Sequence, residues 1–252
     1  MLCRSGRKQI QIRYSARSCF FIDAAAPKCY DWKYHIDGMS RMMTEAIDTP
    51  VTGVILAGGR SRRMGQNKAL MRLGKEPLIA HVIRQLEWAT DELLLITNEP
   101  DLYTDLKLPM YPDILPGMGA LGGLHAGLTY AGNSTVVCVG CDMPLLQPNL
   151  ISHLTTLLGN YDAVVPCVQA ADRSAPVFQT LSAVYSKRCL PAVDAMLAAG
   201  ELRVHALYDH IDVRIVRPHE WQAFDPQGLS FFNINTPEDF EKATVYWRKS
   251  SC

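Results

Sequence analysis

The chain has 252 residues, 48% of them hydrophobic, which is enough to bury the core of one globular domain with an extension. Its 25 basic and 25 acidic residues cancel, which argues against a nucleic-acid-binding protein that relies on a broad basic face. The longest apolar runs, at 51–57 and 136–139, are far shorter than the roughly 20 residues that cross a bilayer, so no membrane partner is expected.

The eight cysteines follow no regular spacing, and several lie in apolar, strand-like surroundings. This distribution favours free thiols in a reducing compartment, so we expect a cytoplasmic protein. Cys138 and Cys141 form a C-x-x-C pair, but no second cysteine pair or histidine pair stands nearby. The pair is therefore a weak indication of a zinc or redox site.

The first fifty residues differ from the rest of the chain. They carry five basic residues before the first acid, Asp23, and show no sustained periodicity. Such a start can be an organelle transit peptide. It can also be an upstream stretch outside the folded protein, because Met39, Met42 and Met43 lie just before the first predicted strand, and we favour this second interpretation. We predict a disordered or non-native extension over residues 1–50 and a folded domain over residues 51–252.

From Val51 onward, short apolar runs alternate with helical patterns. Strands are predicted at 51–57, 92–97, 135–141, 162–166, 178–184 and 211–216, and helices at 77–89, 121–130, 148–158, 190–199 and 237–247. Several of the strands are apolar throughout, as expected of parallel strands that are covered on both faces. The alternation predicts an α/β fold, a three-layer α/β/α sandwich around a Rossmann-like, mostly parallel sheet.

Polar and glycine residues follow three of these strands. Ala57 and Gly58 follow the first, Asn98 follows the second and Asp142 follows the third. Because ligands bind outside the carboxyl ends of the strands in open α/β sheets, we expect these residues to line one crevice.

The first of these loops is rich in glycine and positive charge. Residues 54–68 read V-I-L-A-G-G-R-S-R-R-M-G-Q-N-K. Since glycine lacks a Cβ, Gly58 and Gly59 let the backbone approach a polyphosphate closely, and Arg60, Arg62, Arg63 and Lys68 supply charge. Neither the P-loop nor the dinucleotide fingerprint fits this spacing, so the pattern predicts a different phosphate-binding loop.

Three further motifs follow in order. Residues 113–127 read D-I-L-P-G-M-G-A-L-G-G-L-H-A-G, residues 141–144 read C-D-M-P, and residues 233–239 read N-I-N-T-P-E-D. Together with L-A-G-G-x-S-x-R-M-G-x-x-K at 56–68, they resemble the molybdenum cofactor guanylyltransferases of the nucleotidyltransferase superfamily. The resemblance covers roughly residues 51–248, and it implies a nucleotidyltransferase domain with the nucleotide-diphospho-sugar transferase type of fold.

Residues 117–122 also spell G-x-G-x-x-G, the fingerprint of dinucleotide-binding domains. That interpretation requires a strand directly before the first glycine, whereas P-D-I-L-P stands there. We therefore assign this segment to the family resemblance and not to a dinucleotide-binding fingerprint. His125, in the helix that follows, is expected to be a structural or surface residue and not a catalytic one.

The resemblance implies transfer of GMP from GTP to the terminal phosphate of Mo-molybdopterin, with pyrophosphate as the leaving group. Because the attacking phosphate is already an anion, the protein has mainly to position the substrates and neutralise their charge. Arg63, Lys68 and Asp142 are the implied catalytic residues. The implied partners are GTP, Mo-molybdopterin, and proteins of molybdenum insertion and molybdoenzyme maturation.

Asp142 is the candidate ligand for Mg²⁺, the expected cofactor, because this ion takes hard oxygen ligands and shares its shell with phosphates and water. A helix N-cap is the alternative for Asp142, and an Asx turn is the alternative for the two asparagines of the last motif. The substrate-binding positions that the resemblance implies are Leu56, Ala57, Gly58, Gly59, Lys68, Asn98, Asp113, Asp142, Arg203, Asn233 and Asn235.

The chain departs from the family's pattern in places. Asn67 replaces the usual aspartate before the lysine, Ala120 replaces a proline, and Ala175 stands where a histidine is common. Two alternatives stay open. The first is a molybdopterin cytidylyltransferase or another small NTP transferase, although L-A-G-G and C-D-M-P favour guanine. The second is a non-catalytic nucleotide-binding protein of the same fold.

Overall fold

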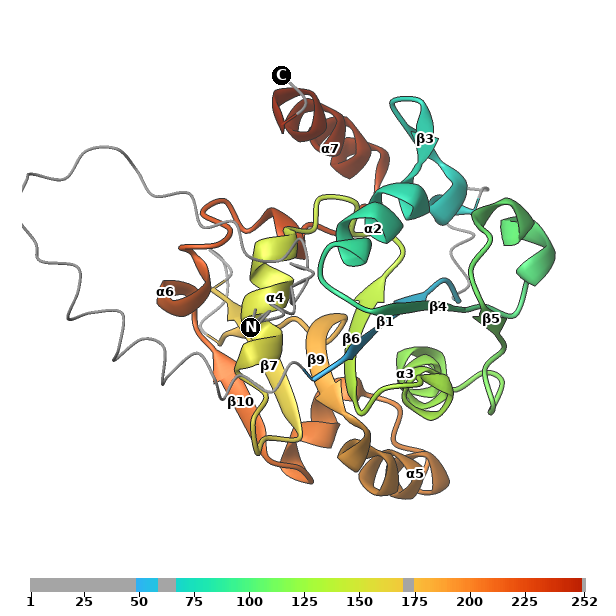
Figure 1. Ribbon diagram of the computed structural model, residues 1–252, viewed down its shortest axis with the longest axis vertical. Helices are drawn as coiled ribbons and strands as arrows, with labels where there is room; N and C mark the ends of the chain where they lie inside the picture. Colours follow the sequence, from blue (N-terminus) through green and yellow to red (C-terminus); the bar gives the residue numbers. More distant parts are fainter. Residues whose placement is uncertain (1–48, 59–66, 170–174, 251–252) are drawn as a thin grey trace, which may run out of the picture. The chain divides into compact units, whose positions relative to one another are not determined.

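A twisted, mostly parallel sheet organises the computed structural model, which describes residues 49–58, 67–169 and 175–250 (Figure 1). In these residues its order is β10-β7-β9-β6-β1-β4-β5, with β8 paired to β7, and β2 and β3 form a separate hairpin. The strands are β1 (Val51–Leu56), β2 (Arg72–Leu73), β3 (Glu76–Pro77), β4 (Glu92–Ile96), β5 (Met110–Tyr111), β6 (Thr135–Gly140), β7 (Ala163–Val168), β8 (Val177–Phe178), β9 (Ser182–Ser186) and β10 (Val213–Val216).

The predicted α/β architecture is confirmed, with two strands, β8 and β9, running opposite to the others in the described sheet. β9 pairs antiparallel with both β6 and β7, whereas the neighbours along the rest of the main path are parallel. The run predicted as one strand at 178–184 is divided, because a turn closed by the Ser182 N–H and the Gln179 carbonyl separates β8 from β9. The two-residue strands were not predicted, since so short a segment carries no periodicity.

Helices cover both faces of the sheet (Figure 1). Ile55 of β1 belongs to a buried cluster with α2 and α4, while Val54 and Leu56 belong to one with α3 and α5. The helices are α2 (Leu78–Glu87), α3 (Gly119–Tyr130), α4 (Pro148–Thr156), α5 (Leu190–Ala198), α6 (Pro218–Trp221) and α7 (Pro237–Ser250), with 3-10 turns η2 (Lys68–Leu70), η3 (Pro100–Leu106), η4 (Lys187–Cys189), η5 (Val204–Asp209) and η6 (Leu229–Phe231). The five predicted helices are all present, and the predicted three layers are confirmed.

A third, smaller apolar cluster attaches α7 to the β2–β3 hairpin. It contains Leu73, Leu145, Ile234 and Ala243. This cluster fixes the segment before α7, which carries the last of the sequence motifs.

None of the helices in the described part of the chain is long and apolar enough to cross a membrane. The predicted extension over residues 1–50 lies almost wholly outside the described residues and stays a prediction.

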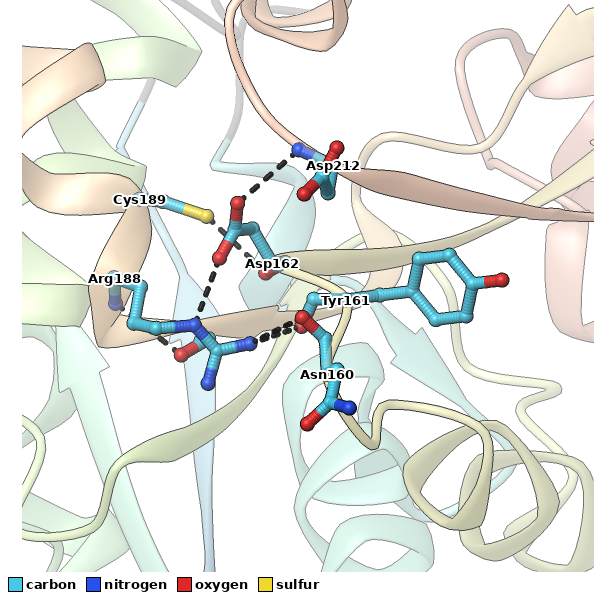
Figure 2. A network of polar contacts seen from close by, with 7 residues as sticks. Asn160, Tyr161, Asp162, Arg188, Cys189 and Asp212 are labelled. Carbon is cyan, nitrogen blue, oxygen red and sulfur yellow. Dashed lines mark hydrogen bonds and ion pairs between the residues drawn. The ribbon is translucent and has the colours of Figure 1, made fainter.

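Asp162 joins three segments at the amino ends of β7 and β10 (Figure 2). Its carboxylate accepts hydrogen bonds from Arg188 Nε at 2.8 Å and from the Asp212 N–H at 3.1 Å, and its carbonyl accepts one from the Ser186 N–H at 2.7 Å. Burial opposes ionisation, but the hydrogen bonds from Arg188 and Asp212 outweigh it and lower the pKa of Asp162. These contacts lie at the edge of the sheet opposite to the carboxyl ends of the parallel strands, so the network is structural.

The glycines of α3 that face β1 provide a test of the packing. A Cβ at Gly127 would lie 2.6 Å from Val54 Cγ1, whereas one at Gly123 would meet the flexible end of Leu56 at 3.2 Å. We expect Gly127→Ala to lower the free energy of unfolding by about 1–3 kcal/mol through overpacking. Gly123→Ala should change it by less than about 1 kcal/mol, because the gain in helix propensity offsets a milder contact. Urea unfolding of the two variants measures this, and equal effects would contradict the proposed packing.

Candidate functional site

The carboxyl ends of β1, β4 and β6 meet at one edge of the sheet. Leu56 lies opposite Ile96 of β4 and Gly140 of β6 in the parallel register. The next residues continue the ladder, because the Ala57 N–H donates to the Ile96 carbonyl at 2.9 Å and the Cys141 N–H to the Leu56 carbonyl at 3.2 Å. The structure therefore brings the ends of these three strands together, as the sequence predicts.

Asp142 is a partly buried carboxylate at the centre of this edge. A Cβ at Gly140 would lie 2.7 Å from Asp142 Oδ1, so the glycine leaves the space that the carboxylate occupies. Burial raises the pKa of the Asp142 carboxyl, and the positive charge of Lys68 partly opposes that rise. Among the described residues, no cation lies within ion-pair distance of Asp142. The carboxylate is thus held in place without a pairing side chain from this part of the chain.

Lys68, near the start of the domain in sequence, contacts a residue near its end. Its side chain is only 8% exposed, and its Nζ donates a hydrogen bond of 3.0 Å to Asn235 Oδ1. Since the Asn235 side chain accepts from Lys68, the structure supports a site role for it beside the alternative of an Asx turn. Lys68, Asp142 and Asn235 form the candidate site.

The segment before α7 is fixed to Asp142 through its backbone. The Ile234 N–H donates to the Asp142 carbonyl at 3.0 Å, and the Ile234 side chain is fully buried. Asn233 and Asn235 flank Ile234 and are both exposed. Because a buried residue stands between two exposed ones, both asparagine side chains point away from the core.

A reciprocal cap begins α7 just beyond these asparagines. The N–H groups of Asn235 and Thr236 both donate to Asp239 Oδ2 at 3.0 Å, and the Asp239 N–H donates to Thr236 Oγ1 at 3.1 Å. This is a capping box in which aspartate takes the place of glutamate. The capping box explains the T-P-E-D part of the last motif, because its hydrogen bonds fix the position of Asn235.

Asn98 and Asp113 form a second group along the same edge. Asn98 Nδ2 donates to Asp113 Oδ2 at 2.8 Å, and the Asp113 N–H donates to Asn98 Oδ1 at 3.0 Å. A cavity of about 160 Å³ adjoins them, lined by Thr97, Asn98, Pro100, Met110, Tyr111 and Pro112. The two hydrogen bonds fix the side chains of Asn98 and Asp113 relative to each other, and Asn98 also lines this cavity.

The structure does not bring every predicted residue into contact. Arg63 and Gly59 lie outside the described residues. Leu56 is 8% exposed and its side chain packs against Gly123, while its carbonyl already accepts a hydrogen bond from the Cys141 N–H. Arg203 is exposed, and no described contact connects it to Lys68 or Asp142, because Glu201 holds its guanidinium by hydrogen bonds of 2.9 and 2.6 Å.

The C-x-x-C pair lies on two faces of the sheet. Cys138 belongs to the cluster with α3 and α5, whereas Cys141 packs against the cluster with α2 and α4. Burial raises the pKa of both thiols to about 12, which disfavours the thiolate that metal or redox chemistry requires. In the described segments no three histidine, cysteine, aspartate or glutamate side chains could hold a metal together. An ion at Asp142 would need ligands beyond these side chains.

Sequence reasoning missed one residue that contacts the chain next to this site. Tyr103 of η3 is buried, and its hydroxyl accepts a hydrogen bond of 2.8 Å from Asn67 Nδ2, next to Lys68. A tyrosine within a short 3-10 turn belongs to none of the motifs, so no sequence signal could have identified it.

Comparison with known proteins agrees with these observations. The MobA-like NTP transferase domain model matches residues 53–214. A protein from Pelotomaculum thermopropionicum named probable molybdenum cofactor guanylyltransferase is 38% identical over 194 residues, which are 77% of this chain and 92% of the relative. The molybdenum cofactor guanylyltransferase of Desulfosudis oleivorans is 34% identical over 194 residues, which are 77% of this chain and 94% of that protein.

A solved structure extends the comparison to the fold. Molybdopterin-guanine dinucleotide biosynthesis protein A from Archaeoglobus fulgidus aligns with a TM-score of 0.66 at 24% identity, over 79% of this chain and 99% of that one. The predicted sandwich of the nucleotide-diphospho-sugar transferase type is confirmed.

The buried Asp142 carboxylate has a consequence for stability. Because its pKa is raised on folding, ionisation destabilises the fold, so wild-type stability falls as pH rises from below 3.8 through the raised pKa. We expect Asp142→Asn to be more stable than wild type at pH 7 and to lose this advantage below about pH 4. Chemical unfolding with EDTA and without nucleotide measures the difference.

Asp162→Asn provides the control of opposite sign. The lowered pKa of Asp162 means that its ionised form stabilises the protein above pH 3.8, so this variant should be less stable than wild type at pH 7. A loss of stability in Asp142→Asn at pH 7 would contradict the raised pKa of the Asp142 carboxyl.

Proposed function

The chain belongs to the MobA-like NTP transferase family, and we propose that it transfers GMP from GTP to the terminal phosphate of Mo-molybdopterin, releasing pyrophosphate. The observation that carries this proposal is the convergence of Lys68, Asp142 and Asn235 at the carboxyl edge of the sheet. They come from three separate motifs, so the fold brings cation, carboxylate and amide to one place.

Lys68 acts as the phosphate-binding cation. Its ammonium group is a point charge that suits phosphate oxygens, and its low exposure strengthens its electrostatic effect. Asn235 orients this group through the 3.0 Å hydrogen bond. In the reaction, Lys68 neutralises charge on the polyphosphate, which is the main task when the nucleophile is already anionic. Arg63 would add a second cation from the glycine loop.

Asp142 fits the role of the Mg²⁺ ligand. Its carboxylate is partly buried, its charge is not neutralised by an ion pair from the described residues, and its backbone is fixed by Ile234. A single carboxylate suits Mg²⁺, which usually keeps several waters and completes its shell with substrate phosphates. When bound, the ion would supply charge neutralisation at the α-phosphate and the leaving pyrophosphate.

Asp113, oriented by Asn98, is the residue that we propose recognises guanine. Asp113 Oδ2 already accepts from Asn98, and Oδ1 accepts no hydrogen bond from the described residues. The Watson–Crick edge of guanine offers two adjacent donors, N1–H and N2–H, that a carboxylate can accept. Cytosine lacks this pair of donors, so Asp113 favours GTP over CTP.

The acceptor would lie near Asn233 and Asn235, with Arg203 as a further anion-binding group. Both asparagines are exposed and belong to the segment attached to Asp142. We expect the labile product to pass between cytoplasmic proteins of molybdenum insertion and molybdoenzyme maturation. The buried, free cysteines agree with a reducing compartment.

Pyrophosphate release tests the proposed reaction directly. Wild-type protein with Mg²⁺ and Mo-molybdopterin should release pyrophosphate with GTP and much less with CTP, ATP or UTP. Lys68→Ala should lower kcat/KM for GTP by about 10- to 100-fold, since hydrogen bonds to charged groups contribute about 1.5–3 kcal/mol. The matched control is Lys187→Ala, because this partly buried lysine lies at the opposite edge and donates to the Ala131 carbonyl.

Each other outcome points to a different activity. A preference for CTP would make the protein a cytidylyltransferase. GTP binding without turnover would favour the non-catalytic alternative, and equal activity of Lys68→Ala and wild type would remove Lys68 from the site.

Base selectivity is the second test of the proposed function. Asp113→Asn places one amide donor against the donors of guanine, so we expect kcat/KM for GTP to fall by about tenfold or more. The ratio of GTP to CTP turnover should fall with it. Asp212→Asn, at the amino edge of β10, serves as the control and should keep the wild-type ratio. An unchanged ratio in Asp113→Asn would exclude Asp113 from base recognition.

A further inference from the structure

Tyr103 supports the phosphate-binding lysine from a distant part of the chain. It lies on η3, is 1% exposed, and belongs to the core cluster with α2 and α4. Burial raises the pKa of its phenol, while the hydrogen bond from Asn67 partly opposes that rise. The hydroxyl is thus a neutral group in the core, and among the described residues its side-chain hydrogen bond is the one from Asn67 at 2.8 Å.

Asn67 is held at both ends of its amide. Its Nδ2 donates to Tyr103, and its Oδ1 accepts from the Ala69 N–H at 3.1 Å, which caps η2. Its carbonyl also accepts from the Leu70 N–H at 3.1 Å. Because Asn67 directly precedes Lys68, these bonds fix the backbone from which the lysine side chain starts.

Lys68 is consequently anchored at its base and at its tip. The base is fixed through Asn67, and Nζ is fixed by Asn235 Oδ1 at 3.0 Å. A lysine side chain is flexible, so the orientation of its ammonium group depends on how firmly its backbone is held. Only Tyr103 connects this backbone to the core through a side-chain hydrogen bond among the described contacts of Asn67.

We propose that Tyr103 is a positioning residue that acts through Asn67 to hold Lys68 in its phosphate-binding orientation. Loss of the hydroxyl would leave the Asn67 NH₂ group without its acceptor against the core. The amide would then turn to find a new partner and release its bond to the Ala69 N–H. Lys68 would become more mobile, although the substitution itself removes none of the contacts that Lys68 makes.

Lysine acylation in the absence of nucleotide tests this step. The full-length protein is treated with an N-hydroxysuccinimide ester of acetate, and the labelling rate of each lysine is measured by mass spectrometry. Tyr103→Phe should increase the labelling rate of Lys68 by about threefold or more. Lys187, which donates to the Ala131 carbonyl, is the internal reference and should keep its rate.

Tyr185→Phe is the matched control variant. Tyr185 is also fully buried, and its hydroxyl bonds to the Thr180 carbonyl at 2.9 Å and the Tyr208 hydroxyl at 3.1 Å. It lies in the cluster with α3 and α5, so its loss should leave Lys68 labelling unchanged. An unchanged Lys68 rate in Tyr103→Phe, or an equal rise in both variants, would overturn the proposal.

GTP binding gives a second measurement, which rests on the proposed function. Tyr103→Phe should weaken GTP binding by about fivefold in the wild-type background and by less than twofold in Lys68→Ala, because contacts that act through one residue are not additive. Equal effects in both backgrounds would overturn the role of Lys68. If wild-type protein binds no GTP, the proposed function fails, while the labelling result still decides the role of Tyr103.

Discussion

The hydrogen bond from the Ile234 N–H to the Asp142 carbonyl is the constraint on which the site depends. It joins the end of β6 to the segment before α7, which lies about ninety residues further along the chain. Ile234 is buried at this point, so the backbone bond and the apolar contact hold each other in place. With this junction formed, Asn235 reaches Lys68, and the capping box of α7 prevents the segment from shifting.

The same junction creates an electrostatic cost. It places a carboxylate and an ammonium group in a region of low exposure, and among the described residues they do not form a direct ion pair. Two partly buried charges held apart are less stable than a closed pair. The proposed nucleotide substrate and its cation would bring a charge of opposite sign to each of these two groups. The stability lost in the free protein would be recovered on binding.

Sequence patterns predicted the strands of the sheet well but said little about their direction or pairing. Apolar runs located β1, β4, β6, β7 and β10, and the rule that ligands bind at the carboxyl ends of strands placed Asp142 correctly at the edge. The reversal of β9 was not predictable, because residue periodicity is the same in either direction. The reciprocal bonds of Asn98 and Asp113 were also missed, since they depend on the two-residue strand β5.

Asn67 shows how a departure from the family's pattern can preserve structure and change charge. An aspartate at this position would accept from the Ala69 N–H as the Asn67 side chain does, and it would accept a hydrogen bond from the Tyr103 hydroxyl in place of donating one. Both side chains therefore cap η2 and reach the core. The difference is a negative charge next to Lys68, which the asparagine removes. The departure leaves the anchoring of Lys68 intact and makes the surroundings of the lysine more favourable to a polyanionic substrate.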